Sequence, residues 1–288
     1  MMSRLGILFL RTMALLPLRW VRALGTALGL LLYVLVFPRR RVVDVNFRLC
    51  FPQWSAAERR RATREVFIHV VQSFLDRGWL WHSEPEVVQR RLKVTGAVAD
   101  LAGNEPTIVF LPHFVGLDAA VTALTQQVQR RFLGIYTQQS NKIVDEWVFK
   151  GRHRFGDARG MSRSEGVRDL IAAMRAGHIM ILLPDMNFGA EESIWVPFYG
   201  VPAATLPSLS RFARLGRAKV VPVVPQLTPE GYEVRVLDAW TNFPSGNLEA
   251  DTARMNEQLE HYIDEMPSQY YWVHKRFKSR PPGEPGVY

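Results

Sequence analysis

The sequence has almost no cysteine and lacks the short motifs of several large enzyme classes. Cys50 is the only cysteine in 288 residues, so no disulfide can form within the chain. No G-x-S-x-G, G-x-x-x-x-G-K-[ST], H-E-x-x-H or paired C-x-x-C occurs, and no G-x-G-x-x-G follows an expected strand. These absences weigh against a serine hydrolase, a P-loop nucleotide hydrolase, a zinc enzyme and a Rossmann dehydrogenase, and we expect no metal site.

Basic side chains outnumber acidic ones. The chain has 36 lysines and arginines against 27 aspartates and glutamates, a formal net charge of +9. Such an excess predicts an anionic partner: a nucleic acid, a membrane surface or a phosphorylated substrate. The aromatic residues lie within apolar runs rather than among the basic clusters, where nucleobases would stack on them, so we expect no nucleic acid.

The N-terminal segment is the most apolar part of the chain. Its cleanest run extends from Ala23 to Phe37, 15 residues, which is fewer than the roughly 20 that cross a bilayer core. The run is long enough only if Trp20 to Arg22 are added, with the arginine reaching back to the interface. Three arginines at 39–41 follow directly, as on the cytoplasmic side of a membrane segment.

We therefore expect a membrane anchor over residues 1–41, either spanning or lying in the interface, and a globular domain over 42–288. A helix buried in the core of the fold is the alternative explanation of the same apolar run.

Strand and helix patterns alternate through the rest of the chain. This alternation predicts an α/β fold with a mostly parallel central sheet flanked by helices. Strands are expected at 107–111, 131–137, 178–185, 218–224 and 232–236, and helices at 117–128, 141–153, 165–176, 207–215 and 252–266. The proline- and glycine-rich end, 281–286, is predicted to be a frayed tail.

A histidine and an aspartate lie at one predicted strand-to-helix junction. The strand that begins at Thr107 ends at Pro112, His113 follows, Gly116 allows a tight turn, and Asp118 lies in the first turn of the next helix. In open α/β sheets, ligands bind at the carboxyl ends of the strands. The junction is therefore a candidate site.

These two residue types suit acyl transfer to a hydroxyl. A neutral imidazole can take a proton from a hydroxyl, and a carboxylate on the other ring nitrogen fixes the tautomer. The arrangement is a Ser-His-Asp triad without its serine, so the substrate's own hydroxyl would attack an activated acyl group. An H-x4-D pattern alone is short and common, and a surface histidine beside a helix-capping aspartate would also produce it.

Four blocks of the sequence together are more specific than the H-x4-D pattern alone. The blocks are His113–Asp118, Leu183–Gly189, Trp195–Thr205 and Trp272–Pro281. In this order, and behind an apolar N-terminus, they resemble the lipid A late acyltransferases of Gram-negative bacteria, over nearly the whole chain. The resemblance implies a glycerol-phosphate-acyltransferase-like fold.

The resemblance implies both a reaction and a location. Members of the family move a fatty acyl chain from acyl carrier protein to a hydroxyl of a lipid A precursor, at the cytoplasmic face of the bacterial inner membrane, without a metal. The carrier thioester is the donor and no cofactor is expected. His113 would be the general base and Asp118 its partner. Another lipid acceptor, such as a lysophospholipid, a glycolipid or an aminolipid, is the alternative.

The resemblance also suggests residues that bind substrate. Arg152 and Arg154 are the first candidates for the phosphates of the acceptor, with a solvated face as the alternative; Arg159 and Arg163 are weaker candidates. Asp185 matches an acidic position of the family, and a catalytic role and a loop-holding role both remain open. The expected partners are acyl carrier protein, the lipid A precursor and membrane phospholipid.

Overall fold

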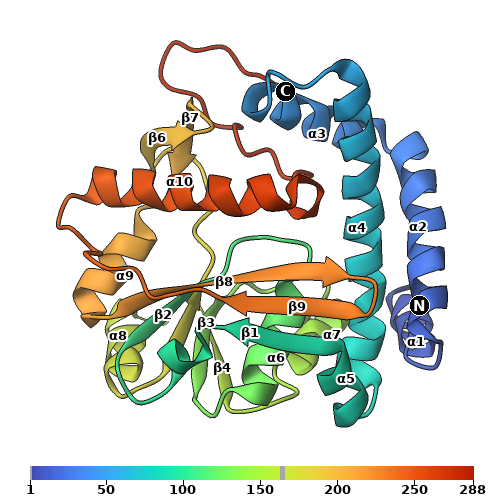
Figure 1. Ribbon diagram of the computed structural model, residues 1–288, viewed down its shortest axis with the longest axis horizontal. Helices are drawn as coiled ribbons and strands as arrows, with labels where there is room; N and C mark the ends of the chain where they lie inside the picture. Colours follow the sequence, from blue (N-terminus) through green and yellow to red (C-terminus); the bar gives the residue numbers. More distant parts are fainter. Residues whose placement is uncertain (1, 163–165) are drawn as a thin grey trace.

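A seven-stranded sheet lies at the centre of the fold. The computed structural model describes residues 2–162 and 166–288, and Figure 1 shows the sheet with helices around it. The strand order is β1-β9-β8-β2-β5-β3-β4, and each neighbouring pair is parallel except β8 with β9. The predicted α/β fold with a mostly parallel sheet is confirmed. The strands are β1 Leu92–Gly96, β2 Thr107–Phe110, β3 Phe132–Tyr136, β4 Ala158–Ser162, β5 Ile179–Leu182, β8 Lys219–Thr228 and β9 Gly231–Val236.

Helices cover both faces of this sheet. Because both faces are covered, the central strand β2 is buried at every position, with Ile108 and Phe110 in one hydrophobic cluster and Val109 in the other. The α-helices are α1 Met2–Met13, α2 Leu18–Leu35, α3 Phe37–Cys50, α4 Ala56–His82, α5 Pro85–Arg91, α6 Leu117–Gln127, α7 Lys142–Arg152, α8 Val167–Arg175, α9 Ser208–Gly216 and α10 Leu248–Glu265. Two short 3-10 helices are η1 Val98–Leu101 and η2 Pro267–Gln269.

The proline-rich segment after β5 forms a separate antiparallel hairpin. Its strands are β6 Ile194–Phe198 and β7 Val201–Thr205, and Tyr199 and Gly200 make the turn with positive φ angles of 51° and 72°. The hairpin packs beside α10 (Figure 1). Neither of these strands is among those predicted from the sequence.

The prediction of a frayed C-terminal tail is wrong. The Tyr288 hydroxyl accepts a hydrogen bond from the Phe277 backbone N–H at 3.0 Å and donates one to Asn46 Oδ1 at 2.5 Å. The end of the chain is thereby fixed against α3 (Figure 1).

The apolar N-terminal segment forms two helices, α1 and α2, beside α4. By length and composition α2 is able to cross a membrane, and only 17% of its 18 residues are buried. The predicted boundary between an anchor and a catalytic domain at residue 41 falls inside α3, so the secondary structure is continuous there.

Candidate active site

His113 and Asp185 lie opposite one another at the carboxyl edge of the sheet. They follow β2 and β5, which are parallel neighbours with Phe110 paired to Leu182. His113 is three residues after Phe110, and Asp185 is three residues after Leu182. Because the register is in phase, these equal offsets bring the two side chains together: His113 Nδ1 is 2.8 Å from Asp185 Oδ1.

The Asp185 carboxylate is fully buried and has three donors around it. Beyond Nδ1 of His113, its Oδ2 accepts the His113 backbone N–H at 3.0 Å and the Tyr270 hydroxyl at 3.0 Å. Burial alone would raise the pKa of Asp185, but the His113 ring and the hydrogen bonds from the ring and backbone of His113 lower it below its usual value. An ionised carboxylate only accepts, so the proton of the neutral His113 ring is on Nδ1.

The other nitrogen of His113 is open to a substrate. The His113 side chain is 26% exposed, and no residue of the described ranges hydrogen-bonds to its Nε2. A ring with Nδ1–H held by a carboxylate and a free Nε2 lone pair is the form that removes a proton from a hydroxyl.

The C-terminal segment fixes the loop that contains His113. Backbone hydrogen bonds join Val115 N–H to Gln269 at 2.8 Å and Tyr271 N–H to His113 at 2.9 Å. His274 approaches from the same segment; burial and the charge of Arg276 lower the pKa of its ring to about 4, and its Nε2 accepts the Asn187 backbone N–H at 3.1 Å. His274 is therefore neutral at ordinary pH.

The expected contact between Asp118 and His113 is replaced by two ion pairs. Arg77 Nε from α4 is 2.7 Å from Asp118 Oδ2, and Arg152 Nε from α7 is 2.8 Å from Asp118 Oδ1. Burial would raise the pKa of the Asp118 carboxyl, yet the two guanidinium groups hold it well below its usual range. In this structure the carboxylate that orients His113 is Asp185, because Asp118 points from the first turn of α6 toward the arginines.

Arg77, Asp118 and Arg152 form a cluster with a net charge of +1. Only the Nε atom of each arginine contacts Asp118, and the Nη atoms have no hydrogen-bond partner among the described residues. The arginine side chains are 27% and 32% exposed, so these Nη groups are accessible. Two guanidinium groups, each planar and each with free Nη donors, suit a phosphate.

The other predicted arginines lie in different surroundings. Arg154 donates to the backbone carbonyls of Leu80, at 3.1 Å, and Ser83, so its guanidinium joins the turn after α7 to the end of α4 and does not belong to the arginine cluster. Arg159 is on β4, paired with Leu133 of β3. Arg163 lies outside the described residues.

Three contributors to the site were not predicted from the sequence. Arg77 is 41 positions before Asp118 and lies inside α4 near its C-terminal end, and no local sequence pattern sets it apart from the other arginines of that helix. Tyr270 and His274 follow α10 in an irregular segment; His274 lies within the Trp272–Pro281 block and Tyr270 two residues before it, but neither was singled out. One signal did point to the His113–Asp185 pair: each residue follows a Leu-Pro that ends a buried strand.

Comparison with known proteins identifies the family. Residues 1–279 match the model of the bacterial lipid A biosynthesis acyltransferases. The chain belongs to this family. The lipid A acyltransferase relatives match over almost the full chain: the lauroyltransferase of Escherichia coli K12 is 30% identical over 290 residues, 99% of this chain and 94% of that protein.

Two further relatives show comparable similarity. The myristoyltransferase of Escherichia coli K12 is 32% identical over 254 residues, 85% of this chain and 77% of that protein. A lipid A biosynthesis acyltransferase of Haemophilus influenzae is 30% identical over 286 residues, 97% of this chain and 88% of that protein. The predicted family and the predicted enzyme class, an acyltransferase, are confirmed.

Solved structures offer a more distant match. The crystal structure of 1-acyl-sn-glycerophosphate acyltransferase from Thermotoga maritima is 14% identical, with a TM-score of 0.40, and covers 85% of this chain and 97% of that one.

Proposed function

We propose that this acyltransferase moves a fatty acyl chain from the thioester of acyl carrier protein to a hydroxyl of a lipid A precursor, with His113 as general base. The observation that supports this most directly is the His113–Asp185 pair, which leaves the Nε2 lone pair of a correctly protonated imidazole open to the substrate. Family membership supports lipid A as the class of acceptor.

In the first step the acceptor hydroxyl attacks the thioester carbonyl. His113 Nε2 takes the hydroxyl proton as the new carbon–oxygen bond forms, which gives a tetrahedral intermediate and an imidazolium. Asp185 stabilises this imidazolium through the 2.8 Å hydrogen bond to Nδ1–H.

In the second step the intermediate collapses to the ester. The carbon–sulfur bond breaks, the thiol of the carrier leaves, and His113 returns the proton from Nε2 to the sulfur. The neutral imidazole is restored without an acyl-enzyme intermediate. Proton transfer by a positioned base contributes roughly 10² to 10⁴ to the rate, and the placement of two bound substrates contributes more.

The arginine cluster, Arg77 and Arg152 on Asp118, is proposed to bind a phosphate of the acceptor. Its net positive charge and its free Nη donors support this role. Arg152 was predicted for the acceptor phosphates, and Arg77 now joins it. Arg154 is left out of this proposal because backbone carbonyls occupy its guanidinium.

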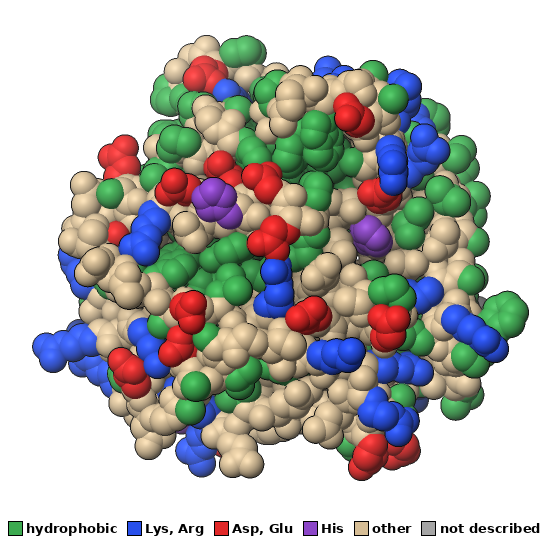
Figure 2. Space-filling model, viewed as in Figure 1, with side chains coloured by type: hydrophobic (Ala, Val, Ile, Leu, Met, Phe, Trp, Pro, Cys, Tyr) green, Lys and Arg blue, Asp and Glu red, His purple; other side chains and the backbone are tan. Residues whose placement is uncertain are grey.

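The enzyme is proposed to work on the cytoplasmic face of the bacterial inner membrane, in contact with phospholipid. Figure 2 shows hydrophobic side chains mixed with basic ones along the edge formed by α1 and α2. Arg39, Arg40 and Arg41 follow α2 directly and suit anionic headgroups. Large apolar side chains that are exposed on this edge include Leu5, Leu8, Phe9, Leu15, Trp20, Leu31, Val34, Leu35 and Phe37.

An acyl transfer assay with defined substrates tests the proposal. Purified enzyme in detergent would receive a lipid A precursor and a ladder of acyl carrier protein thioesters, and separately a lysophospholipid and an aminolipid. We expect transfer to the lipid A precursor and a preference for one chain length. Transfer to a lysophospholipid or an aminolipid but to no lipid A precursor would refute the proposed acceptor.

A further inference from the structure

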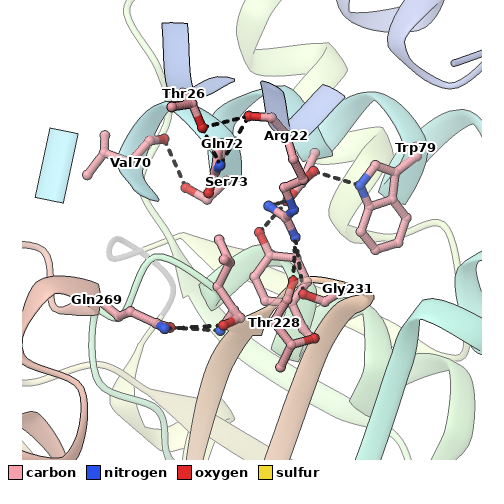
Figure 3. Close-up of polar contacts among 12 residues, drawn as sticks. Arg22, Thr26, Val70, Gln72, Ser73, Trp79, Thr228, Gly231 and Gln269 are labelled. Carbon is pink, nitrogen blue, oxygen red and sulfur yellow. Dashed lines mark hydrogen bonds and ion pairs between the residues drawn. The ribbon is translucent and has the colours of Figure 1, made fainter. Parts of the chain in front are cut away.

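Helix α2, which is long and apolar enough to cross a membrane, is tied to the catalytic domain by a buried ion pair. Arg22 of α2 is only 9% exposed, and its Nη1 is 2.6 Å from Oδ2 of Asp76 on α4, which is fully buried. Its Nη2 donates to the carbonyl of Gly231 at 3.1 Å and to that of Thr228 at 3.4 Å, at the β8–β9 turn. Figure 3 shows Arg22 between α4 and this turn.

The aspartate of this pair is held from three elements at once. The Tyr232 hydroxyl of β9 donates to Asp76 Oδ2 at 2.6 Å, and the Trp79 indole donates to Asp76 Oδ1 at 2.8 Å. One turn away, Gln72 donates to the Arg22 carbonyl and to the Thr26 hydroxyl, both at 3.1 Å (Figure 3). The contact of α2 with α4 and the β8–β9 turn is therefore specific and polar.

Two glycines let the helix backbones approach each other closely. A Cβ added to Gly25 would lie 2.6 Å from Gln72 Cγ, and one added to Gly29 would lie 2.6 Å from Ile68 Cα. These distances are shorter than any that real Cβ atoms adopt, so the α2 sequence is fitted to the α4 surface over at least one full turn.

This packing conflicts with a lone transmembrane α2. If α2 left α4 to cross the bilayer, Asp76 would stay buried without its cation, which is strongly unfavourable. If α4 accompanied α2, charged residues of α4 such as Arg64, Glu65 and Arg77 would enter the hydrocarbon, where charges are rare and costly.

We propose that α2 does not span the membrane but lies in the headgroup region of one leaflet, docked on α4, with its outer apolar face against the lipid. The occupant of that face is a phospholipid leaflet. The mixture of exposed apolar and basic side chains on α1 and α2 matches an interfacial helix, which buries one face and keeps cations at the headgroups. This inference rests on the proposed membrane location.

The arrangement would also place the active site at the membrane surface. Asp76, which holds Arg22, is followed directly by Arg77, which holds Asp118. The helix on the lipid and the proposed phosphate-binding arginine are thus fixed to the same turn of α4. A lipid acceptor could reach the arginines while its acyl chains remain in the leaflet.

Cysteine labelling of membrane-bound enzyme tests this inference, because the chain has a single, buried cysteine to remove. In a Cys50→Ala background, Arg19→Cys marks the start of α2, Arg41→Cys marks the region after its end, and Glu191→Cys marks the catalytic domain. Each variant would be expressed in cells, and sealed inverted inner-membrane vesicles would be treated with a membrane-impermeant maleimide before and after detergent. Only variants whose unfolding midpoint in detergent matches that of the Cys50→Ala parent would be compared.

We expect all three positions to be labelled to a similar extent, within about twofold, before detergent is added. Labelling of either the Arg19→Cys or the Arg41→Cys site only after permeabilisation would show that α2 crosses the bilayer and would overturn the inference. Recovery of the protein in the supernatant rather than with the vesicles would overturn it as well. The labelling does not depend on the acceptor used, so its outcome is independent of the proposed reaction.

Discussion

The substitution Asp185→Asn tests which carboxylate supports the base. An asparagine has the same shape, but its amide nitrogen would face Nδ1 of His113, 2.8 Å away in the native enzyme. Two donors cannot form a hydrogen bond with each other, so the imidazole would adopt the tautomer with its proton on Nε2. In that form Nε2 could no longer accept the proton of the hydroxyl. The developing imidazolium would also lose its buried anion.

The expected loss follows from these two effects. General base catalysis is worth about 10² to 10⁴ in rate, so kcat should fall by about that factor, which corresponds to about 3 to 5 kcal/mol of transition-state stabilisation. KM for the acceptor should change little, because Asp185 is buried beneath the imidazole and has no exposed surface.

The assay is steady-state transfer from a carrier thioester, with kcat and KM measured between pH 5 and 9. Asp118→Asn is the matched control, since it neutralises the carboxylate of the H-x4-D pattern without touching Nδ1 of His113. We expect this control to raise KM and to leave the shape of the pH profile of kcat unchanged. A kcat for Asp185→Asn within fivefold of the native value, or a pH profile altered only by Asp118→Asn, would refute the assignment.

Three further substitutions test other parts of the structure. Arg22→Met breaks a buried ion pair and should lower the free energy of unfolding in detergent by about 3 to 5 kcal/mol. Arg61→Ala removes an exposed ion pair and should change the free energy of unfolding by less than about 0.5 kcal/mol. Equal effects of the two substitutions would contradict the buried network around Arg22. Asp118 has a lowered pKa in the folded protein, so its ion pairs stabilise the fold above the unfolded pKa of about 3.9 and are lost only as pH falls through the lower, folded value. The difference in unfolding midpoint between native enzyme and Asp118→Asn should therefore be constant from pH 8 to 5 and shrink below about pH 4; a difference that stays constant down to about pH 2 would mean that the pKa of Asp118 is not lowered. Arg152→Ala should raise KM about tenfold for a phosphorylated acceptor but not for its dephosphorylated form, because a charge-assisted hydrogen bond is worth about 1.5 to 3 kcal/mol. Lys150→Ala on the same helix is the control. An equal rise in KM for both acceptors would show that Arg152 does not bind the phosphate.

Local sequence patterns predicted most of the helices and strands, but not β4, β6 and β7, and they did not predict the direction in which side chains point. The strand before His113 and the helix after it were predicted nearly to the residue, since an apolar run, a proline and a glycine mark their limits. Asp118 was expected on His113 because the two are five positions apart. The helix that begins at Leu117 turns the carboxylate toward α4 and α7 instead, and the sequence offers no local sign of Arg77.

Long-range contacts account for most of what the sequence did not reveal. The pairing of β2 with β5 brings together two residues that are 72 positions apart, and it depends on strand order, which alternation of strands and helices does not determine. Tyr288 donates a hydrogen bond to Asn46, 242 positions earlier in the chain. The glycine- and proline-rich sequence near Tyr288 predicted a frayed tail because this contact is not visible locally. The apolar run of α2 indicated a membrane segment. That Arg22 of this run is buried and paired with Asp76 of α4 is visible only in the folded structure.

A single-turnover assay with His113→Ala tests the central claim most directly. Native enzyme, His113→Ala and the surface control His261→Ala would each be mixed in excess with lipid A precursor and acyl carrier protein thioester. We predict transfer by the native enzyme and by His261→Ala at the same rate, and a rate for His113→Ala lower by about 10² to 10⁴, with the fold of each variant verified by its unfolding midpoint. Equal transfer rates for native enzyme and a folded His113→Ala would contradict the assignment of His113 as the base.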